Sequence, residues 1–173
     1  MIPREGHAEP AKTRARGFGK PAVLYEAGVR HFRAGAHLDA QLCCQQALAM
    51  DPHHADTMHL MGLISLHANR HDLAVEWISR AIKQDPKPEY LTSLGTTLLK
   101  QGRREEALKT FDKAVQLGPD RAELWKNLGD VLQELDRPDD ALLSYQHALK
   151  LDPHNSEAAD KSASLVSELS RLK

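Results

Sequence analysis

Histidine and cysteine are the residues of this chain whose chemistry could serve catalysis or metal binding. The 173 residues include ten histidines and two cysteines. His53 and His54 fall in a predicted turn, and His67 and His71 lie on either side of another, but none is accompanied by cysteines or carboxylates at the spacing of a metal site. HExxH, P-loop, GxSxG and GxGxxG motifs are all missing. We therefore predict a protein without catalytic residues, metal ligands or cofactors.

The two cysteines, Cys43 and Cys44, are adjacent in the sequence. Neighbouring helix residues cannot form an unstrained disulfide, so we expect both thiols to stay reduced. Reduced thiols are typical of a cytoplasmic protein, and we predict that localisation. Residues 1–20 lack the apolar core of a secretory signal, and no run of 18 apolar residues predicts a membrane span.

The composition favours an all-α fold. Leu and Ala, which favour helices, contribute 25 and 22 residues, whereas Val and Ile, which favour sheets, contribute 6 and 4. The hydrophobic share of 41% is enough to bury a core. The formal net charge of −1 argues against a dedicated nucleic-acid binder, because such proteins carry a basic excess.

Four series of residues recur along the chain with the same steps of 34, 33 and 34 residues, which indicates an internal repeat. The series are Pro52, Pro86, Pro119 and Pro153; Gly28, Gly62, Gly95 and Gly129; Ala40, Ala74, Ala107 and Ala141; and Ala47, Ala81, Ala114 and Ala148. Each unit predicts two helices, at about 22–34 and 38–49 in the first. The proline ends the second helix, because the residue before a proline is driven out of the α region.

The residue between the two helices of a unit must reverse the chain. The four residues at that point are Gly35, Asn69, Gly102 and Asp136, all of types that tolerate a positive φ. We therefore expect a left-handed residue at each reversal. On the second helix, Cys44 stands where the third and fourth units have Phe111 and Tyr145, so we expect a buried core thiol.

The repeat resembles the tetratricopeptide repeat family, whose signature is a large residue, Leu-Gly three positions on, small residues on the second helix, and a proline. The fourth unit matches best, with Trp125, Leu128, Gly129, Ala141, Tyr145, Ala148 and Pro153. In the first unit, Arg30 and His31 stand where small or apolar residues are usual. The resemblance covers about residues 21–155. It implies an all-α, right-handed superhelical solenoid of four helix-turn-helix repeats, about 21–54, 55–87, 88–121 and 122–155.

Both ends of the predicted array differ from the repeats. Residues 1–20 carry five basic and two acidic side chains, and we predict a disordered basic arm that is solvated, the alternative being contact with an acidic partner or nucleic acid. We predict a C-terminal capping helix at 156–173, because the last repeat would otherwise expose an apolar face. Its apolar residues at helical spacing are Ala159, Ala163, Val166 and Leu169. The alternative is a linker to a further domain.

Without a catalytic motif, function must come from a surface. In tetratricopeptide proteins the first helices of the repeats line a concave groove. The resemblance therefore implies that the stripe of these helices facing away from the second helices binds a peptide. The stripe comprises Tyr25, Val29, Phe32, Arg33, His59, Leu63, Leu66, His67, Thr92, Thr96, Leu99, Lys100, Lys126, Asp130, Gln133 and Glu134. Asn127 joins it as the one residue that fits the asparagine ladder by which some members hold extended peptides, but Glu26, Leu60 and Ser93 stand at its counterparts, so that binding mode does not carry over.

The chemistry of the predicted groove changes along the array. Phe32, Leu66 and Leu99 occupy equivalent positions and would form an apolar row, and the residue after each is basic or titratable. The last repeat is acidic, with Asp130 and Glu134. We hypothesise a peptide ligand with apolar anchors, an acidic part facing the first three repeats and a basic part facing the last. The alternative is that Leu66 and Leu99 simply pack against neighbouring repeats.

Three functions fit this sequence. The first is a non-catalytic interaction module or scaffold that binds a peptide segment of a partner protein. The second is the N-terminal, substrate-targeting part of a larger enzyme, because tetratricopeptide arrays precede glycosyltransferase or sulfotransferase domains in some families. The third is a module that self-associates into a homo-oligomer through its end faces or its groove.

Overall fold

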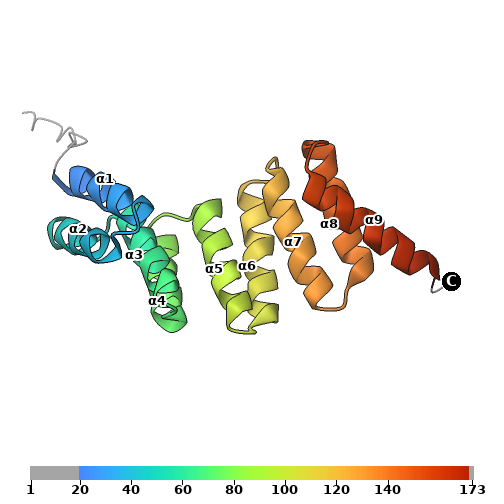
Figure 1. The fold of residues 1–173 in the computed structure, drawn as a ribbon, viewed down its shortest axis with the longest axis horizontal. Coiled ribbons are helices and arrows are strands. Elements are labelled where there is room, and N and C mark those ends of the chain that lie inside the picture. The colour runs from blue at the N-terminus through green and yellow to red at the C-terminus, as the bar shows by residue number, and fades with distance from the viewer. Residues whose placement is uncertain (1–19, 172–173) are drawn as a thin grey trace, which may run out of the picture.

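The computed structural model describes residues 20–171, and residues 1–19 and 172–173 lie outside the described part. Nearly all of the predicted basic arm is among the residues outside it. Residues 20–171 form nine helices (Figure 1). They are α1 (Lys20–Arg33), α2 (His37–Met50), α3 (Ala55–His67), α4 (His71–Gln84), α5 (Pro88–Lys100), α6 (Arg104–Leu117), α7 (Ala122–Glu134), α8 (Pro138–Leu151) and α9 (Ser156–Arg171). The predicted all-α fold is confirmed.

The helices pack in consecutive pairs (Figure 1). α1 packs on α2, α3 on α4, α5 on α6 and α7 on α8, and each pair contacts the next through α2–α3, α4–α5 and α6–α7. The odd-numbered helices also contact one another, α1 with α3, α3 with α5 and α5 with α7. The result is a solenoid of four helix-turn-helix repeats followed by α9, with the odd-numbered helices together on one side.

A left-handed residue reverses the chain in each repeat, as predicted. The φ angle is 76° at Gly35, 57° at Asn69, 73° at Gly102 and 55° at Asp136. Glycine has no Cβ to strain this conformation, and Asn and Asp are the other types that adopt it readily. The amide that follows each of these residues hydrogen-bonds to a carbonyl in the last turn of the preceding helix, which closes the helix end.

A side chain of the second helix packs on the glycine of the first helix in each repeat. Tyr145 lies on Gly129 and Phe111 lies on Gly95, where an added Cβ would come within 2.6 and 2.7 Å of ring carbons. The glycines therefore let two backbones approach with an aromatic ring between them. In the first repeat the smaller Cys44 takes this place and is fully buried, as predicted. Its burial raises the pKa of the thiol to about 12.

Two positions of each first helix pack against the preceding repeat. Their buried occupants are Thr57, Tyr90, Leu124 and Ala158 at one position and Ile64, Thr97, Val131 and Leu165 at the other. The corresponding residues of α1 are Val23, which is 60% exposed, and Arg30, which is also exposed. The unusual Arg30 therefore lies on the end face of the described array, where a charged side chain can stay solvated.

The face of α9 that packs on the array differs from the predicted one. Ala158 and Leu165 are buried there, whereas Ala159 and Ala163 are exposed and Val166 is 47% exposed. The reason is the repeat register, because Ala158 and Leu165 follow buried residues of α7 by one period. The expectation that the apolar spacing of Ala159, Ala163 and Val166 marks the packed side was wrong.

Candidate functional site

The odd-numbered helices carry the predicted groove residues, and the N-terminal half of that surface is hollowed. Phe32 of α1, Leu63, Leu66 and His67 of α3, and Lys100 of α5 line one hollow together. Asn69 completes the lining and was missed as a site residue, because its sequence signal was that of a turn. Three repeats thus contribute predicted residues to a single depression.

Aromatic rings form one wall of this hollow. The ring centroids of Phe32 and His67 lie 5.9 Å apart in an edge-on arrangement, and His37 lies 5.4 Å from Phe32 and 4.3 Å from His67. Phe32 is half-buried and packs against the core of the first two repeats. Leu99 is half-buried as well and packs against the core of the later repeats. Phe32 and Leu99 of the apolar row therefore pack partly on the core and stay partly at the surface.

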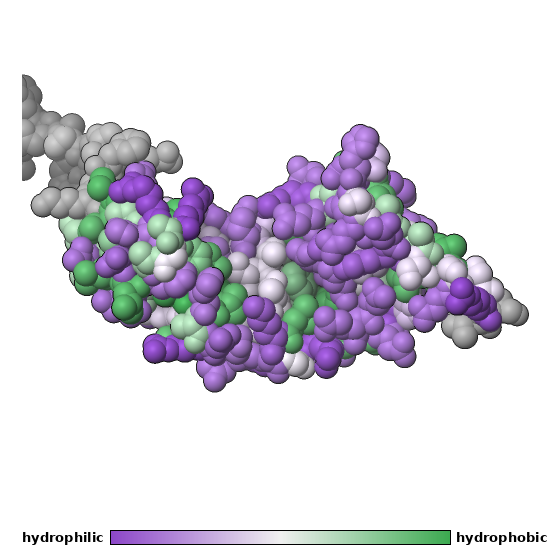
Figure 2. Space-filling view, viewed as in Figure 1, coloured by the Kyte–Doolittle hydropathy of each residue, from purple (hydrophilic) through white to green (hydrophobic). Residues whose placement is uncertain are grey.

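Lys100 brings a positive charge to this hollow, and Arg33 follows Phe32 at the end of α1. Arg33 and Lys100 are exposed, and neither forms an ion pair with any residue in the part of the chain that the structure describes. Hydrophobic surface gathers over the N-terminal helices in Figure 2, whereas hydrophilic surface covers α7. The N-terminal part of the array thus combines apolar surface with cations that can meet an acidic group.

His59 and Tyr25 are held by contacts within the array rather than projecting freely. The His59 ring lies 4.5 Å from the Tyr90 ring, and its Nε2 is 2.9 Å from Ser93 Oγ. Burial of the imidazole lowers the pKa of His59 to about 4, so this ring is neutral at physiological pH. Tyr25 packs against the N-terminal core, 5.5 Å from the ring of His54.

The remaining predicted residues of the first three repeats vary in exposure. Val29 packs against the N-terminal core. The Thr92 hydroxyl donates a hydrogen bond to the carbonyl of Pro88 at 2.9 Å, while Thr96 is exposed. Thr92 and Thr96 of α5 therefore offer a peptide only small polar groups.

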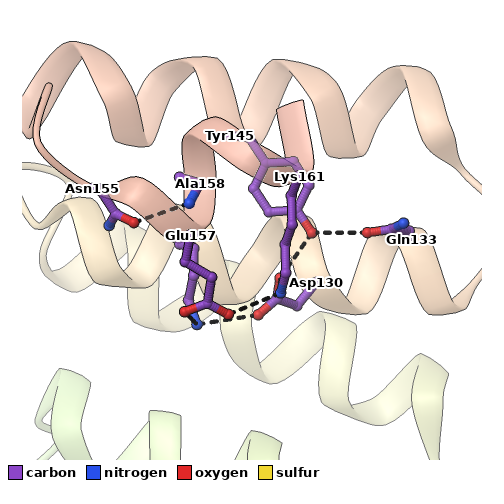
Figure 3. Close-up of polar contacts among 8 residues, drawn as sticks. Asp130, Gln133, Tyr145, Asn155, Glu157, Ala158 and Lys161 are labelled. Carbon is purple, nitrogen blue, oxygen red and sulfur yellow. Dashed lines mark hydrogen bonds and ion pairs between the residues drawn. The ribbon is translucent and has the colours of Figure 1, made fainter. Parts of the chain in front are cut away.

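In the last repeat, the predicted acidic residues are already paired. Asp130 accepts hydrogen bonds from Tyr145 Oη at 2.8 Å and from Lys161 Nζ at 2.6 Å, and Lys126 Nζ lies 3.3 Å from it (Figure 3). Glu134 forms an ion pair of 3.2 Å with Arg104. Both carboxylates that we expected to face a basic part of a ligand thus already have cationic partners within the array.

Glu157 extends this network along α9. It pairs with Lys126 at 3.2 Å and with Lys161 at 3.0 Å, and these contacts lower the pKa of its carboxyl. Burial, reinforced by Asp130, raises the pKa of Tyr145. The network ties α7, α8 and α9 together, so its role is structural.

The other predicted residues of α7 lie around this network. Gln133 accepts a hydrogen bond from Tyr145 Oη at 3.1 Å, and Asn127 is half-buried. Lys161 was missed by the sequence reasoning, because nothing in the sequence pairs it with a carboxylate 31 residues earlier.

Neither a membrane span nor a metal cluster is found in the part of the chain that the structure describes. No helix between residues 20 and 171 combines the length and apolar composition needed to cross a bilayer. In the same range, no three His, Cys, Asp or Glu side chains gather as metal ligands.

Solved structures resemble the fold closely at low sequence identity. PilF of Pseudomonas aeruginosa is 24% identical with a TM-score of 0.81, covering 88% of this chain and 70% of that one. YrrB, described as a TPR protein with an unusual peptide-binding site, is 18% identical with a TM-score of 0.72, covering 85% of this chain and 76% of that one. These likenesses concern the fold alone.

A sequence relative is the human protein O-mannosyl-transferase TMTC1, 35% identical over 72 residues. The match covers 42% of this chain but only 8% of the relative, and the mouse counterpart is 26% identical over 98 residues, with 10% of its length covered. The chain therefore matches about a tenth or less of the length of these curated relatives. Two sequence models described as tetratricopeptide repeat match residues 31–95 and 92–156, and with the fold above they show that the chain belongs to the tetratricopeptide repeat family.

Proposed function

We propose that this chain is a non-catalytic interaction module that binds a peptide segment of a partner protein on the side lined by its odd-numbered helices. Tetratricopeptide arrays in general serve as protein-interaction scaffolds, and the observation that carries the proposal is the hollow between α1, α3 and α5. It brings Phe32, Leu63 and Leu66 to one surface beside the cation of Lys100, which forms no ion pair within residues 20–171. Apolar side chains with a few well-placed polar groups are what a peptide anchor needs.

The ligand that suits this surface carries one or two large apolar side chains with an acidic residue nearby. The apolar side chain would enter the hollow, and the carboxylate would meet Lys100 or Arg33. The basic segment that the sequence suggested is no longer part of the proposal, since Asp130 and Glu134 are paired within the array.

Selection from a random peptide display library on the purified chain tests this proposal. We expect enriched peptides that combine Leu, Phe or Trp with Asp or Glu. Their recovery should be lost when the selection is repeated on a Lys100→Glu variant and kept on Lys83→Glu, which changes an exposed lysine of α4. Enrichment of the same peptides on both variants would overturn the proposal.

A second candidate function rests on the likeness to the O-mannosyl-transferase. The chain would then be the array of a larger glycosyltransferase and would position protein substrates for it. An immunoblot of the native protein tests this idea. A band well above the 19.3 kDa of this chain, with glycosyltransferase peptides found in it by mass spectrometry, supports it, whereas a band at 19.3 kDa rejects it.

A further inference from the structure

A cavity of about 170 Å³ lies between the first and second repeats, and we name it the first inter-repeat cavity. Residues at the start of α2, the end of α3 and the start of α4 line it. Met61 and Ile64 give it a buried apolar surface, and Leu38 of α2 is 84% exposed beside them. The rings of His37 and His67, with centroids 4.3 Å apart, complete an aromatic wall. Only His67 also lines the hollow of the proposed peptide site, so the cavity is a separate feature.

Arg70 brings a permanent positive charge to this cavity. It lines the cavity from the turn between α3 and α4 and forms no ion pair within residues 20–171. No aspartate or glutamate between residues 20 and 171 lies in the lining. The planar guanidinium matches the geometry of a carboxylate, so this cavity favours an anion of that shape.

The later repeats have equivalent cavities, and in each of them an arginine is paired with a carboxylate of the chain. Arg103 and Glu106 line the one between α4, α5 and α6, and Arg137 and Asp140 line the one between α6, α7 and α8. Arg103 donates two hydrogen bonds to Glu106, at 2.7 and 2.8 Å. Arg137 donates two to Asp140, at 2.9 and 2.7 Å. A paired arginine is therefore the rule at these junctions.

The first inter-repeat cavity keeps the arginine but lacks its partner. Leu73 follows Arg70 by three residues and stands one period before Glu106. Leu73 lines the cavity, so an apolar side chain replaces the carboxylate of the later repeats. We infer that this cavity binds an apolar carboxylic acid, whose carboxylate pairs with Arg70 and whose apolar part lies against Met61 and Leu73. The ligand then supplies the carboxylate that residues 20–171 do not.

The volume of the cavity sets the size of the apolar part. An apolar cavity of about 150 Å³ holds one benzene ring, so this one accommodates a phenyl ring or a branched chain of about four or five carbons. The imidazole rings of His37 and His67 favour a flat aromatic group beside them. A small aryl acid such as 3-phenylpropanoate combines these properties with the carboxylate that Arg70 needs.

Titration of 3-phenylpropanoate into the isotopically labelled whole chain, followed by NMR, tests the inference. We expect saturable amide shifts at millimolar acid, largest around Met61, Arg70 and Leu73. The uncharged 3-phenylpropanamide has the same ring and should bind at least about tenfold more weakly, because it cannot form the charged pair. A short capped peptide that ends in a free phenylalanine carries the same group at a chain end. Tighter binding of this peptide would assign the carboxylate to a protein C-terminus, and weaker binding would assign it to a free acid.

Two variants of one residue separate charge from size. Leu73→Glu restores the carboxylate found in the later repeats, so it should pair with Arg70 and weaken binding of the acid at least about tenfold. Leu73→Gln has the same size without the charge and should keep most of the binding. Arg70→Gln should weaken binding as much as Leu73→Glu. Lys83→Gln removes an exposed charge of α4 outside the cavity and should leave the affinity unchanged.

Four results would overturn the inference. They are the absence of a saturable shift at millimolar acid, equal binding of the acid and the amide, equal effects of Leu73→Glu and Leu73→Gln, and shifts centred on Leu66 and Lys100. The last result would place the acid in the hollow of the proposed peptide site. Lys100→Glu, which removes peptide binding in that proposal, should leave binding of the acid intact, so the two proposals can fail independently.

Discussion

At the residue scale, the array depends on pairs of side chains and glycines rather than on any reactive group. Gly129 and Gly95 accept aromatic rings, Gly62 accepts Ile78, and Gly28 faces the smaller Cys44. Because protein interiors are closely packed, an added methyl group fits only where the neighbouring atoms leave room or can move. The four repeats should therefore differ in how they tolerate the same substitution.

Gly129→Ala should lower the free energy of unfolding by roughly 1–3 kcal/mol, because the new Cβ meets the Tyr145 ring. Gly28→Ala should cost less or stabilise the chain, because its Cβ would come no closer than 3.3 Å to the end of the Leu60 side chain and alanine favours the helix by about 1 kcal/mol. Urea unfolding of both variants measures the difference. Equal effects at the two sites would contradict the packing described above.

His59 should make the stability depend on pH. Its pKa is about 4 in the folded chain and about 6.5 when unfolded, so the unfolded chain binds more protons between these values. Stability should fall as the pH drops from 6.5 to 4, by up to about 3 kcal/mol. The carboxyl of Asp56 also makes the stability fall as the pH drops, because its pKa is lowered in the folded chain. Burial raises its pKa, but hydrogen bonds from Lys87 and Tyr90 hold it below the usual range.

Urea unfolding at pH 7 and pH 4.5 for the native chain and His59→Gln checks this. The loss of stability on acidification should be smaller in the variant, since glutamine does not titrate. The same loss in both proteins would show that the buried imidazole is not its source.

At the scale of elements, α9 is held by a polar network as well as by its two buried residues. Asp130 accepts from Tyr145 and Lys161, which come from α8 and α9. Removing the Asp130 carboxylate leaves the Tyr145 hydroxyl with Gln133 alone and Lys161 with Glu157 alone, and the loss of a part-buried acceptor shared by two helices costs more than a single surface ion pair. The attachment of α9 to the array should depend on this one residue.

Asp130→Ala should destabilise the chain by roughly 1–3 kcal/mol and speed amide hydrogen exchange in α9 more than in α3. Arg104→Ala is the matched control, because it breaks only the exposed pair with Glu134. Hydrogen-exchange mass spectrometry of both variants measures the exchange rates in α9 and α3. Unchanged exchange in α9 of the Asp130→Ala variant would contradict a role of this network in holding the helix.

The sequence predicts the turns and helix ends whose cause lies in neighbouring residues of the chain. The left-handed turns at Gly35 and Asp136 follow from residue type, and helix ends follow from the proline two residues beyond them. The packed face of α9 could not be predicted from its own apolar spacing, because contact with α7 and α8 selects it. The pairing of Asp130 was also out of reach, since Lys161 meets it only after α9 has docked.

For the molecule as a whole, the hydrophobic core is not uniform along the solenoid. One continuous core cluster extends from α5 to α9, whereas two smaller clusters serve the first repeats. Val23 is 60% exposed at a position that is buried in every later repeat. In an array where each repeat contacts only its neighbours, such an end has the lowest local stability.

Amides of α1 and α2 should therefore exchange faster than those of α6 and α7 under native conditions. Hydrogen exchange followed by NMR measures this gradient residue by residue. Uniform protection from α1 to α8 would mean that the array unfolds as one cooperative unit, contrary to this account.

The central claim is that the hollow between α1, α3 and α5 binds a peptide, and calorimetric titration with a display-selected peptide tests it most directly. Leu66→Ala with Lys100→Glu should weaken binding at least about tenfold, since an apolar anchor and its neighbouring charge are lost together. Leu143→Ala with Lys83→Glu, both exposed on second helices, should leave the affinity unchanged. Equal affinities of the two double variants would contradict the claim.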